Sequence, residues 1–369
     1  MISQRLLLAT AITTICGAIS LPALADNNSL KNPNAAERLE NAEQRIQYLE
    51  QRMQDQNKTI ASKQTKGDNW SDSLSFSGAI EVETGLSDPD NGPSTSDTTV
   101  ATVELAAEAA ISDQLSANIV LLYEEDDSGI DVDVAELRYQ FNNSDWFFSA
   151  GQHYVPFGTY ESGLVSDPLT LELGETRETT LTIGYEDENV NAGFYVFNGT
   201  NKKNGSEKIN NWGSNIGYTG EVVSFGLGYI NDLADSDTIE GTLGNNNVTD
   251  YIDGATASLV INAGDITLIA EQLSALSTFT SAPLAGAKPT ARNLEINYAL
   301  QIAGKPATLA VAFQGTDEAS ALDLPEQKNL IGLSVEISDN LGLGFEISKE
   351  EDYNNVSTTN FVAQVAVSF

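Results

Sequence analysis

The sequence ends on Asn360-Phe361-Val362-Ala363-Gln364-Val365-Ala366-Val367-Ser368-Phe369. In this stretch a series of apolar residues alternates with a second series that contains both polar and apolar residues. Successive side chains of a β-strand point to opposite faces, so one face would carry Phe361, Ala363, Val365, Val367 and Phe369. About ten residues is the length of a tilted strand that crosses a bilayer. A soluble β-sandwich could also end on an edge strand, but soluble proteins protect such edges from aggregation. The stretch therefore predicts the last strand of a transmembrane β-barrel, with Phe369 as its assembly signal.

The same alternation recurs along the chain from Leu74 onward. The predicted strands are 74–83, 100–111, 115–124, 131–141, 146–153, 180–185, 190–198, 212–218, 222–231, 251–261, 266–276, 293–302, 307–314, 329–338, 341–348 and 356–369. An even number of strands brings both ends of a single-chain barrel to the same side of the membrane. The sequence therefore predicts an all-β fold, a transmembrane antiparallel β-barrel of about 16 strands over residues 73–369.

The connections between these strands alternate in length, which is an independent check on the prediction. Short turns fall at 112–114, 142–145, 186–189, 219–221, 263–265, 303–306 and 339–340. Longer loops fall at 84–99, 125–130, 154–179, 199–211, 232–250, 277–292, 315–328 and 349–355. Bacterial barrels have short periplasmic turns and longer extracellular loops, in the same strict alternation.

The first 25 residues have the pattern of a secretory signal peptide. Arg5 precedes an apolar stretch from Leu6 to Ile19, and Ala23-Leu24-Ala25 forms a cleavage site. Cys16, the single cysteine of the chain, lies inside this stretch, so the mature chain would have none. Disulfides and cysteine-based zinc sites are therefore excluded.

The chain is strongly acidic, with 53 Asp+Glu against 18 Lys+Arg and a formal net charge of −35. Nucleic acid and anionic lipid would be repelled by this charge, so nucleic acid is excluded as a partner. Acidic chains can be disordered, but here the apolar residues recur at period two. No run of 18 apolar residues follows the signal, so no transmembrane helix is predicted and the strands would contact the outer-membrane lipid.

A short coiled coil is predicted over 26–56, followed by a polar linker over 57–72. Residues at alternating spacings of three and four form its apolar seam: Leu39, Ala42, Ile46, Leu49 and Met53. Arg38 to Glu43 and Arg45 to Glu50 both read Arg-apolar-x-x-apolar-Glu, which resembles a trimerisation motif of short coiled coils. A single amphipathic helix is the alternative. The motif predicts a homotrimer with the coiled coil in the periplasm of a Gram-negative bacterium.

Charged side chains are expected on the inner face of the barrel, because carboxylates facing lipid would be costly. The predicted pore-lining residues are Glu81, Glu83, Glu104, Glu108, Glu136, Arg138, Glu295, Glu336 and Glu346. Barrels of this size enclose an aqueous channel. Only about 47 residues separate the signal from the first strand, fewer than the plug of an energy-coupled receptor has.

The long loop 154–179 is too apolar to lie in water, and we expect it to fold into the barrel and narrow it. The predicted constriction residues are Tyr154, Pro156, Phe157, Gly158, Asp167, Glu172, Glu175 and Arg177. Arg177 is expected to be surrounded by Glu172, Glu175 and Glu178. The alternative is a surface loop closed on its own apolar residues.

The order of these segments, together with 151–158 (Gly-Gln-His-Tyr-Val-Pro-Phe-Gly) and 166–176 (Ser-Asp-Pro-Leu-Thr-Leu-Glu-Leu-Gly-Glu-Thr), resembles the LbtU-type siderophore porin family. The resemblance covers the whole mature chain. It implies passive uptake of a ferric siderophore across the outer membrane without an energy-coupled receptor. A general cation-preferring porin for small solutes fits the strands equally well.

The sequence also bears on two other classes of function. An enzyme is not expected, because His153 is the one histidine and no Gly-x-Ser-x-Gly motif is present. A structural or adhesive barrel is the other alternative, with acidic loops at 88–90 and 124–131 that could hold Ca²⁺ through oxygen ligands. These loops lack EF-hand spacing, and solvated loops are the simpler interpretation. No cofactor and no metal site are predicted.

Overall fold

The computed structural model describes residues 73–125, 129–244 and 247–369. The predicted signal peptide, the coiled coil with its seam, and the linker lie outside these residues.

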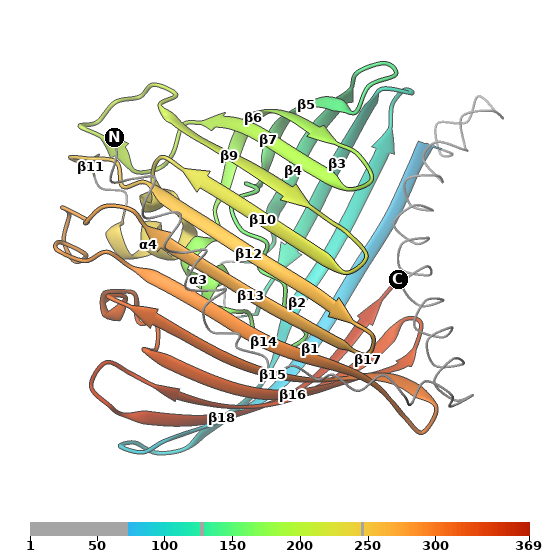
Figure 1. The fold of residues 1–369 in the computed structure, drawn as a ribbon, viewed down its shortest axis with the longest axis vertical. Helices are drawn as coiled ribbons and strands as arrows, with labels where there is room; N and C mark the ends of the chain where they lie inside the picture. The colour runs from blue at the N-terminus through green and yellow to red at the C-terminus, as the bar shows by residue number, and fades with distance from the viewer. Residues whose placement is uncertain (1–72, 126–128, 245–246) are drawn as a thin grey trace, which may run out of the picture. The chain divides into compact units, whose positions relative to one another are not determined.

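Sixteen strands of the described chain form one closed antiparallel barrel, which confirms the predicted fold class (Figure 1). In chain order they are β1 (Leu74–Pro89), β2 (Thr95–Ala110), β3 (Leu115–Tyr123), β4 (Asp131–Gln140), β5 (Trp146–Tyr154), β6 (Arg177–Glu186), β7 (Val190–Phe197), β9 (Asn211–Tyr218), β10 (Val223–Ile230), β12 (Gly254–Ala263), β13 (Ile266–Ala275), β14 (Thr290–Ile302), β15 (Lys305–Asp317), β16 (Gln327–Ser338), β17 (Leu341–Glu351) and β18 (Ser357–Ser368). Each pairs with its neighbours in the chain, and β18 closes the barrel against β1 in the register Val82↔Val365.

The structure differs from the predicted strands most clearly in the first hairpin and in one additional small sheet. β1 and β2 extend to Pro89 and from Thr95, into the predicted loop 84–99. The polar residues there pair across the two strands, as Thr84 does with Thr98, but they lack the apolar alternation that predicts a strand. Two short strands, β8 (Lys202–Lys203) and β11 (Asn247–Val248), pair in parallel in a separate small sheet.

The outer face of the barrel is apolar. Ile80, Ile296, Phe345 and Val365 are each about two-fifths exposed although they lie in strand interiors, and their immediate neighbours point inward. Aromatic pairs gather near the short turns, such as Trp146 with Tyr185 and Tyr218 with Phe225. An apolar band bordered by aromatic residues is the surface that a bilayer requires of a barrel.

Among the described residues, no helix is both long and apolar enough to cross a membrane.

The buried hydrophobic cluster is built mainly from loops at the ends of the strands. It includes Phe157, Leu169 and Leu173 of the third loop, together with Leu233 and Ile239. Short helices carry many of these side chains: α3 (Leu169–Gly174), η3 (Leu233–Asp235), α4 (Asp237–Leu243) and η4 (Ser320–Leu322). The loops are therefore packed against one another at this end of the barrel.

Deleting Phe369 is expected to lower the yield of folded barrel, because its backbone completes the seam between β18 and β1. Its N–H donates to the Gly78 carbonyl, and its carbonyl accepts from the Gly78 N–H, both at 3.0 Å. The measurement is the folded fraction by heat-modifiable gel mobility. Phe361→Ala is the control, since it removes an outward aromatic side chain of β18 but no seam hydrogen bond. Equal folded fractions for the deletion and wild type would contradict the prediction.

Candidate functional site

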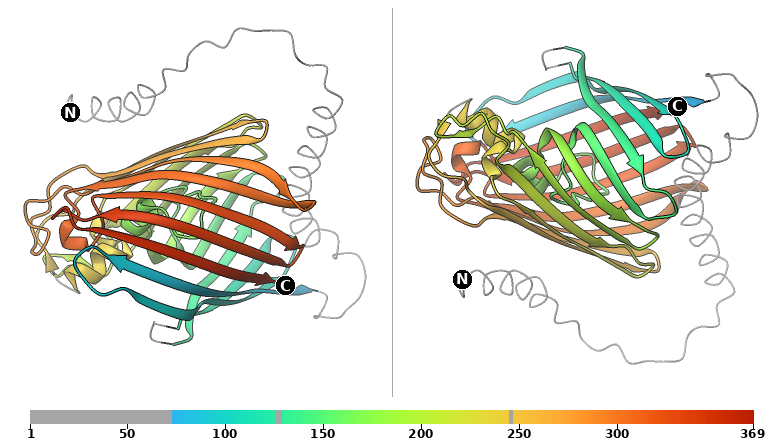
Figure 2. Two further views of the ribbon diagram at one scale, coloured as in Figure 1. Left: turned by 90° about the horizontal axis from the view of Figure 1, so that it is seen from below. Right: turned by 90° about the horizontal axis from the view of Figure 1, so that it is seen from above.

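The loop between β5 and β6, residues 155–176, lies inside the barrel (Figure 2). Its backbone donates hydrogen bonds to carboxylates on the inner faces of three strands. Thr159 N–H donates to Glu271 of β13 at 2.8 Å, and Gly163 N–H to Glu295 of β14 at 2.6 Å. We call these residues, with Glu346 of β17, the tether carboxylates. Each lies more than 100 positions from its loop partner.

Glu346 holds the tip of the loop. It accepts from the Val165 N–H at 3.0 Å and from the Ser166 N–H at 3.1 Å, and Ser166 also donates its hydroxyl. Glu271 accepts further from Tyr160 N–H and from the Thr170 hydroxyl. Hydrogen bonds to a charged acceptor are about twice as strong as those between neutral groups. The loop is therefore fixed to the wall along most of its length.

This attachment corrects the expected role of two pore-lining residues. Glu295 and Glu346 do point inward, since Leu294 and Ile296 on either side of Glu295 are each 44% exposed. However, Glu295 is 0% and Glu346 is 3% exposed, because the loop covers them. They hold the loop and do not line open water. The equivalent Glu271, 3% exposed, was not singled out in the sequence, although it is also an acidic residue on an apolar strand.

Glycines in the wall make room for the loop. A Cβ at Gly228 would overlap the Phe157 carbonyl, a Cβ at Gly332 would lie 2.6 Å from the Leu164 side chain, and one at Gly344 would lie 2.6 Å from Val165. Glycine in a strand often marks a close approach of another backbone. The loop thus sits against β10 and β12 to β17, and the passage is left beside β18 and β1 to β4.

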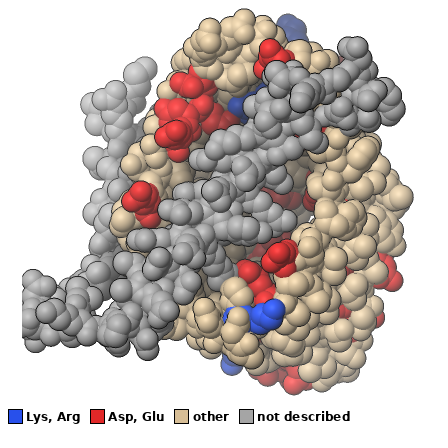
Figure 3. Space-filling view, turned by 90° about the vertical axis from the view of Figure 1, so that its right-hand side faces the viewer, with Lys and Arg blue, Asp and Glu red and all other residues tan. Residues whose placement is uncertain are grey.

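The open side of the barrel carries the remaining predicted carboxylates. Glu81 and Glu83 alternate with the outward Ile80 and Val82, and Gln364 donates to both, at 3.3 and 2.9 Å. The inward positions of β2 and β4 add Glu104, Glu108 and Glu136, each paired in register with an inward neighbour. Figure 3 shows carboxylates in and around the opening at one end of the barrel, with few basic groups.

Glu81 faces the loop across a cavity of about 360 Å³. Asp167, Leu164 and Val165 line the loop side of this cavity, and Glu336 and Gln364 line the wall. Asp167 is one of the predicted constriction residues, and it is exposed. Carboxylates therefore border the narrowed passage on both sides.

The basic side chains of this region are held in ion pairs. Arg138 contacts Glu186 at 2.6 Å and lies 3.6 Å from the centre of the Phe147 ring. Lys328 contacts Glu350 at 3.3 Å. These pairs cancel the positive charge locally, so the net charge of the passage is negative.

Arg177 corrects a second expectation. It forms ion pairs with Asp131 and Asp133 of β4, both at 3.0 Å, and is not surrounded by Glu172, Glu175 and Glu178. Arg177 and Glu178 are the first two residues of β6, and successive side chains of a strand point to opposite faces. The carboxylates that Arg177 meets therefore come from another strand.

The other predicted constriction residues take varied positions. Tyr154 ends β5 and donates its hydroxyl to Asp133 at 2.8 Å, while Phe157 is buried in the loop cluster. Pro156 and Gly158 line a second cavity, described below. Glu172 lies on α3. Burial, reinforced by the nearby Asp237 and Asp167, raises the pKa of Glu175 to about 7.

A group of carboxylates at the loop end of the barrel has spacing compatible with a metal ion. Oxygens of Glu178, Asp235 and Glu240 all lie within 4.8 Å of one another. Asp235 already accepts from the Asn201 N–H at 2.9 Å and from the Asn211 side chain. Burial raises the pKa of Asp235 above its usual value, although these hydrogen bonds act in the opposite direction. The sequence did not suggest this group, because its members come from β6, η3 and α4.

Comparisons with known proteins give two kinds of relative. No protein-family model matches the chain. A UPF0422 protein of Coxiella burnetii is 32% identical over 232 residues, which are 58% of this chain and 50% of the relative. A UPF0422 protein of Legionella pneumophila strain Paris is 27% identical over 327 residues, 79% of this chain and 61% of the relative. The chain thus spans only about half to three-fifths of these curated relatives.

Solved structures with a similar fold are outer-membrane channels. The channel DcaP of Acinetobacter baumannii has a TM-score of 0.58 over 80% of this chain and 97% of its own. An anion-selective porin from Comamonas acidovorans has 0.57 over 80% and 99%, and Salmonella typhi OmpF in complex with daunomycin has 0.57 over 80% and 97%. All three are 13% identical to this chain. At this identity the likeness shows a shared fold.

Proposed function

We propose that this chain is a porin of the Gram-negative outer membrane, which lets small cationic solutes diffuse passively through the passage beside β1 to β4. The observation that carries the proposal is the distribution of charge. The tethered loop leaves open the part of the barrel where Glu81, Glu83, Glu104 and Glu108 point inward. Fixed negative charge between walls of low dielectric raises the local concentration of cations.

Neutralising the wall should weaken this preference. In a planar bilayer with a tenfold KCl gradient, wild type is expected to show a cation-selective reversal potential. Glu104→Gln with Glu108→Gln should lower the ratio of K⁺ to Cl⁻ permeability about threefold, because two charges leave the wall. High salt should weaken the preference in wild type, since the screening length is about 3 Å at 1 M.

The control is Glu188→Gln, which changes an exposed residue of the turn between β6 and β7. It should leave the reversal potential unchanged. An anion-selective wild-type pore would overturn the proposal, since the inward carboxylates could not then set the selectivity.

The cation preference of the channel is expected to change with pH through the ionisation of Glu175. Its pKa of about 7 leaves it neutral in acid and ionised above neutrality, so the loop inside the barrel gains a negative charge as pH rises. The cation preference is therefore expected to grow, about twofold, between about one pH unit below and one above that pKa. Glu175→Gln should reduce this step, while Asp235, whose pKa burial raises into the same range, keeps the remainder. Glu188→Gln should leave the step unchanged. A step of undiminished size in Glu175→Gln would assign the titration to other groups.

A narrower proposal is that the transported solute is a ferric siderophore, which carries a coordinated cation. Its support is the resemblance of residues 151–158 and 166–176 to the siderophore porin family. Segment 166–176 contains Asp167, which lines the cavity beside the passage, and continues into α3. Uptake of a radiolabelled ferric siderophore into proteoliposomes tests it, with an iron-free siderophore as the comparison. No entry of the ferric form through a conducting pore would limit the function to general diffusion.

Two further expectations accompany this function. A homotrimer is proposed from the seam at 39–53, and native mass spectrometry of the detergent-solubilised protein tests it. Absence of enzyme activity is proposed because no Gly-x-Ser-x-Gly motif accompanies His153, the one histidine of the sequence. Nδ1 lies 2.9 Å from the Tyr154 carbonyl and Nε2 lies 2.8 Å from the Thr180 hydroxyl. Hydrolysis of a lipid or peptide ester by pure protein would contradict this second expectation.

A further inference from the structure

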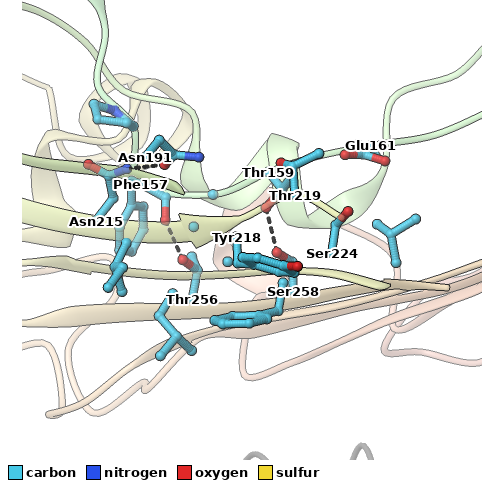
Figure 4. Close-up of a pocket in the computed structure, with 18 residues that line it drawn as sticks. Phe157, Thr159, Glu161, Asn191, Asn215, Tyr218, Thr219, Ser224, Thr256 and Ser258 are labelled. Atoms are coloured by element: carbon cyan, nitrogen blue, oxygen red, sulfur yellow. Dashed lines mark hydrogen bonds between the residues drawn. The ribbon is translucent and has the colours of Figure 1, made fainter. Parts of the chain in front are cut away.

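The loop borders a second cavity, on the opposite side from the acidic passage. This cavity has a volume of about 250 Å³ and lies between residues 156–161 and the inner faces of β7, β9, β10 and β12 (Figure 4). Its wall is chemically different from the acidic passage. Among its lining residues, Glu161 is the one carboxylate, and none is lysine or arginine. The polar side chains are amides and hydroxyls, those of Asn191, Asn215, Ser224, Ser258, Thr159 and Thr256.

These amides and hydroxyls are held in defined positions. Asn215 Nδ2 donates to Asn191 Oδ1 at 3.0 Å, and the Thr159 and Ser258 hydroxyls hydrogen-bond to each other. The Thr256 hydroxyl donates to the Phe157 carbonyl of the loop. Figure 4 shows these three bonds on the wall of the cavity. The polar groups are thus arranged by the loop and the strands together.

Two glycines keep the cavity open. A Cβ at Gly217 would lie 2.6 Å from Asn191 Nδ2, and a Cβ at Gly226 would lie 2.8 Å from the Ser258 hydroxyl. A side chain at either glycine would cover the amide of Asn191 or the hydroxyl of Ser258, so the glycines keep these polar groups accessible from the cavity. The rings of Tyr218 and Phe225 stack on each other on the outer face, where both are about two-fifths exposed. The solute would meet backbone and polar side chains, not aromatic rings.

We infer that this cavity is a binding site for a small neutral polyhydroxylated solute, such as a monosaccharide or polyol. Each hydroxyl of such a solute both donates and accepts, as the hydroxyl and amide groups of the wall do. A volume of about 250 Å³ corresponds to roughly eight waters at about 30 Å³ each, which suits a single sugar ring. Anions lack a basic partner here, and cations have the more acidic passage. Without a stacking ring, binding is weak, which permits release after entry.

The inference goes beyond the proposed cation preference but rests on the same open pore. The test is glucose entry into proteoliposomes as a function of concentration, with KCl conductance measured on the same preparation. Wild type should show saturable glucose entry. Asn191→Leu, which removes an exposed amide, should reduce the initial rate at low glucose about fivefold, as expected for one lost hydrogen bond. Gly226→Val, which fills the cavity from the wall, should do the same.

The matched control is Glu104→Gln with Glu108→Gln, which should alter ion selectivity and leave glucose entry unchanged. Heat-modifiable mobility verifies that every variant is folded. Linear glucose entry in wild type would overturn the inference while the conductance still supported the porin. So would glucose entry in Asn191→Leu and Gly226→Val that saturates as it does in wild type. Choline entry that depends on Asn191 where glucose entry does not would also overturn it, in favour of a cation site. Loss of all conductance in wild type would overturn both proposals.

Discussion

Replacing Glu271 and Glu346 together by alanine is expected to convert a steady channel into one that closes repeatedly. Each carboxylate accepts three or more hydrogen bonds from the loop, so the double substitution removes most of its attachment. Loss of charge-assisted bonds costs about 3 kcal/mol or more, which increases the released population of the loop more than a hundredfold. A released loop moves from the wall of β13 to β17 into the passage beside β1 to β4.

Single-channel recording in a planar bilayer measures this effect as the frequency of closures and the mean current. Glu271→Gln is an informative intermediate variant, because its amide carbonyl still accepts from the loop, and it should close less often than Glu271→Ala. Glu188→Ala in the exposed turn is the control and should record like wild type. If the double variant shows no closures and an unchanged or larger mean current, the tether carboxylates do not position the loop.

Most of the barrel could be predicted from the sequence, because the signal for a barrel strand is local. Alternation within about ten residues decides whether a segment has a lipid face and a lumen face, and Leu294-Glu295-Ile296 is an example. The distal parts of β1 and β2 were missed for the same reason. Both of their faces are polar near Thr84 and Thr98, so the pattern disappears although the pairing continues.

The strands that the loop 155–176 contacts could not be predicted from the sequence. Its apolar composition favoured a buried position, but the groups that hold it lie far along the chain. Thr159 and Glu271 are separated by 112 positions, and Val165 and Glu346 by 181. An inward glutamate that lines water and one that binds a loop backbone look identical in the sequence. Arg177 was misplaced in the same way, since its partners lie on β4 and not beside it.

Glycines on the inner face of the barrel indicate where the loop contacts the strands better than the carboxylates do. β10 contains Gly226 and Gly228 on its inner face, an unusual choice in a strand, because glycine there weakens the strand. At Gly228 the reason is geometric, since the Phe157 carbonyl of the loop occupies the place of a side chain. That carbonyl is also fixed by the Thr256 hydroxyl, and the Phe157 ring is buried in the loop cluster.

Gly228→Ala is therefore expected to destabilise the protein by about 3 kcal/mol, the upper range for an overpacked site, because neither the loop backbone nor β12 can give way. Gly342→Ala is the matched control: it is also a strand glycine, and a Cβ there meets nothing within 4 Å. Its unfolding free energy should stay within about 0.5 kcal/mol of wild type. Urea unfolding followed by heat-modifiable mobility measures both. If Gly228→Ala unfolds at the same urea concentration as Gly342→Ala, the first turn of the loop is mobile against β10. The tether carboxylates and the buried cluster would then hold the loop, and the loop side of the neutral cavity beside Gly226 would not be fixed.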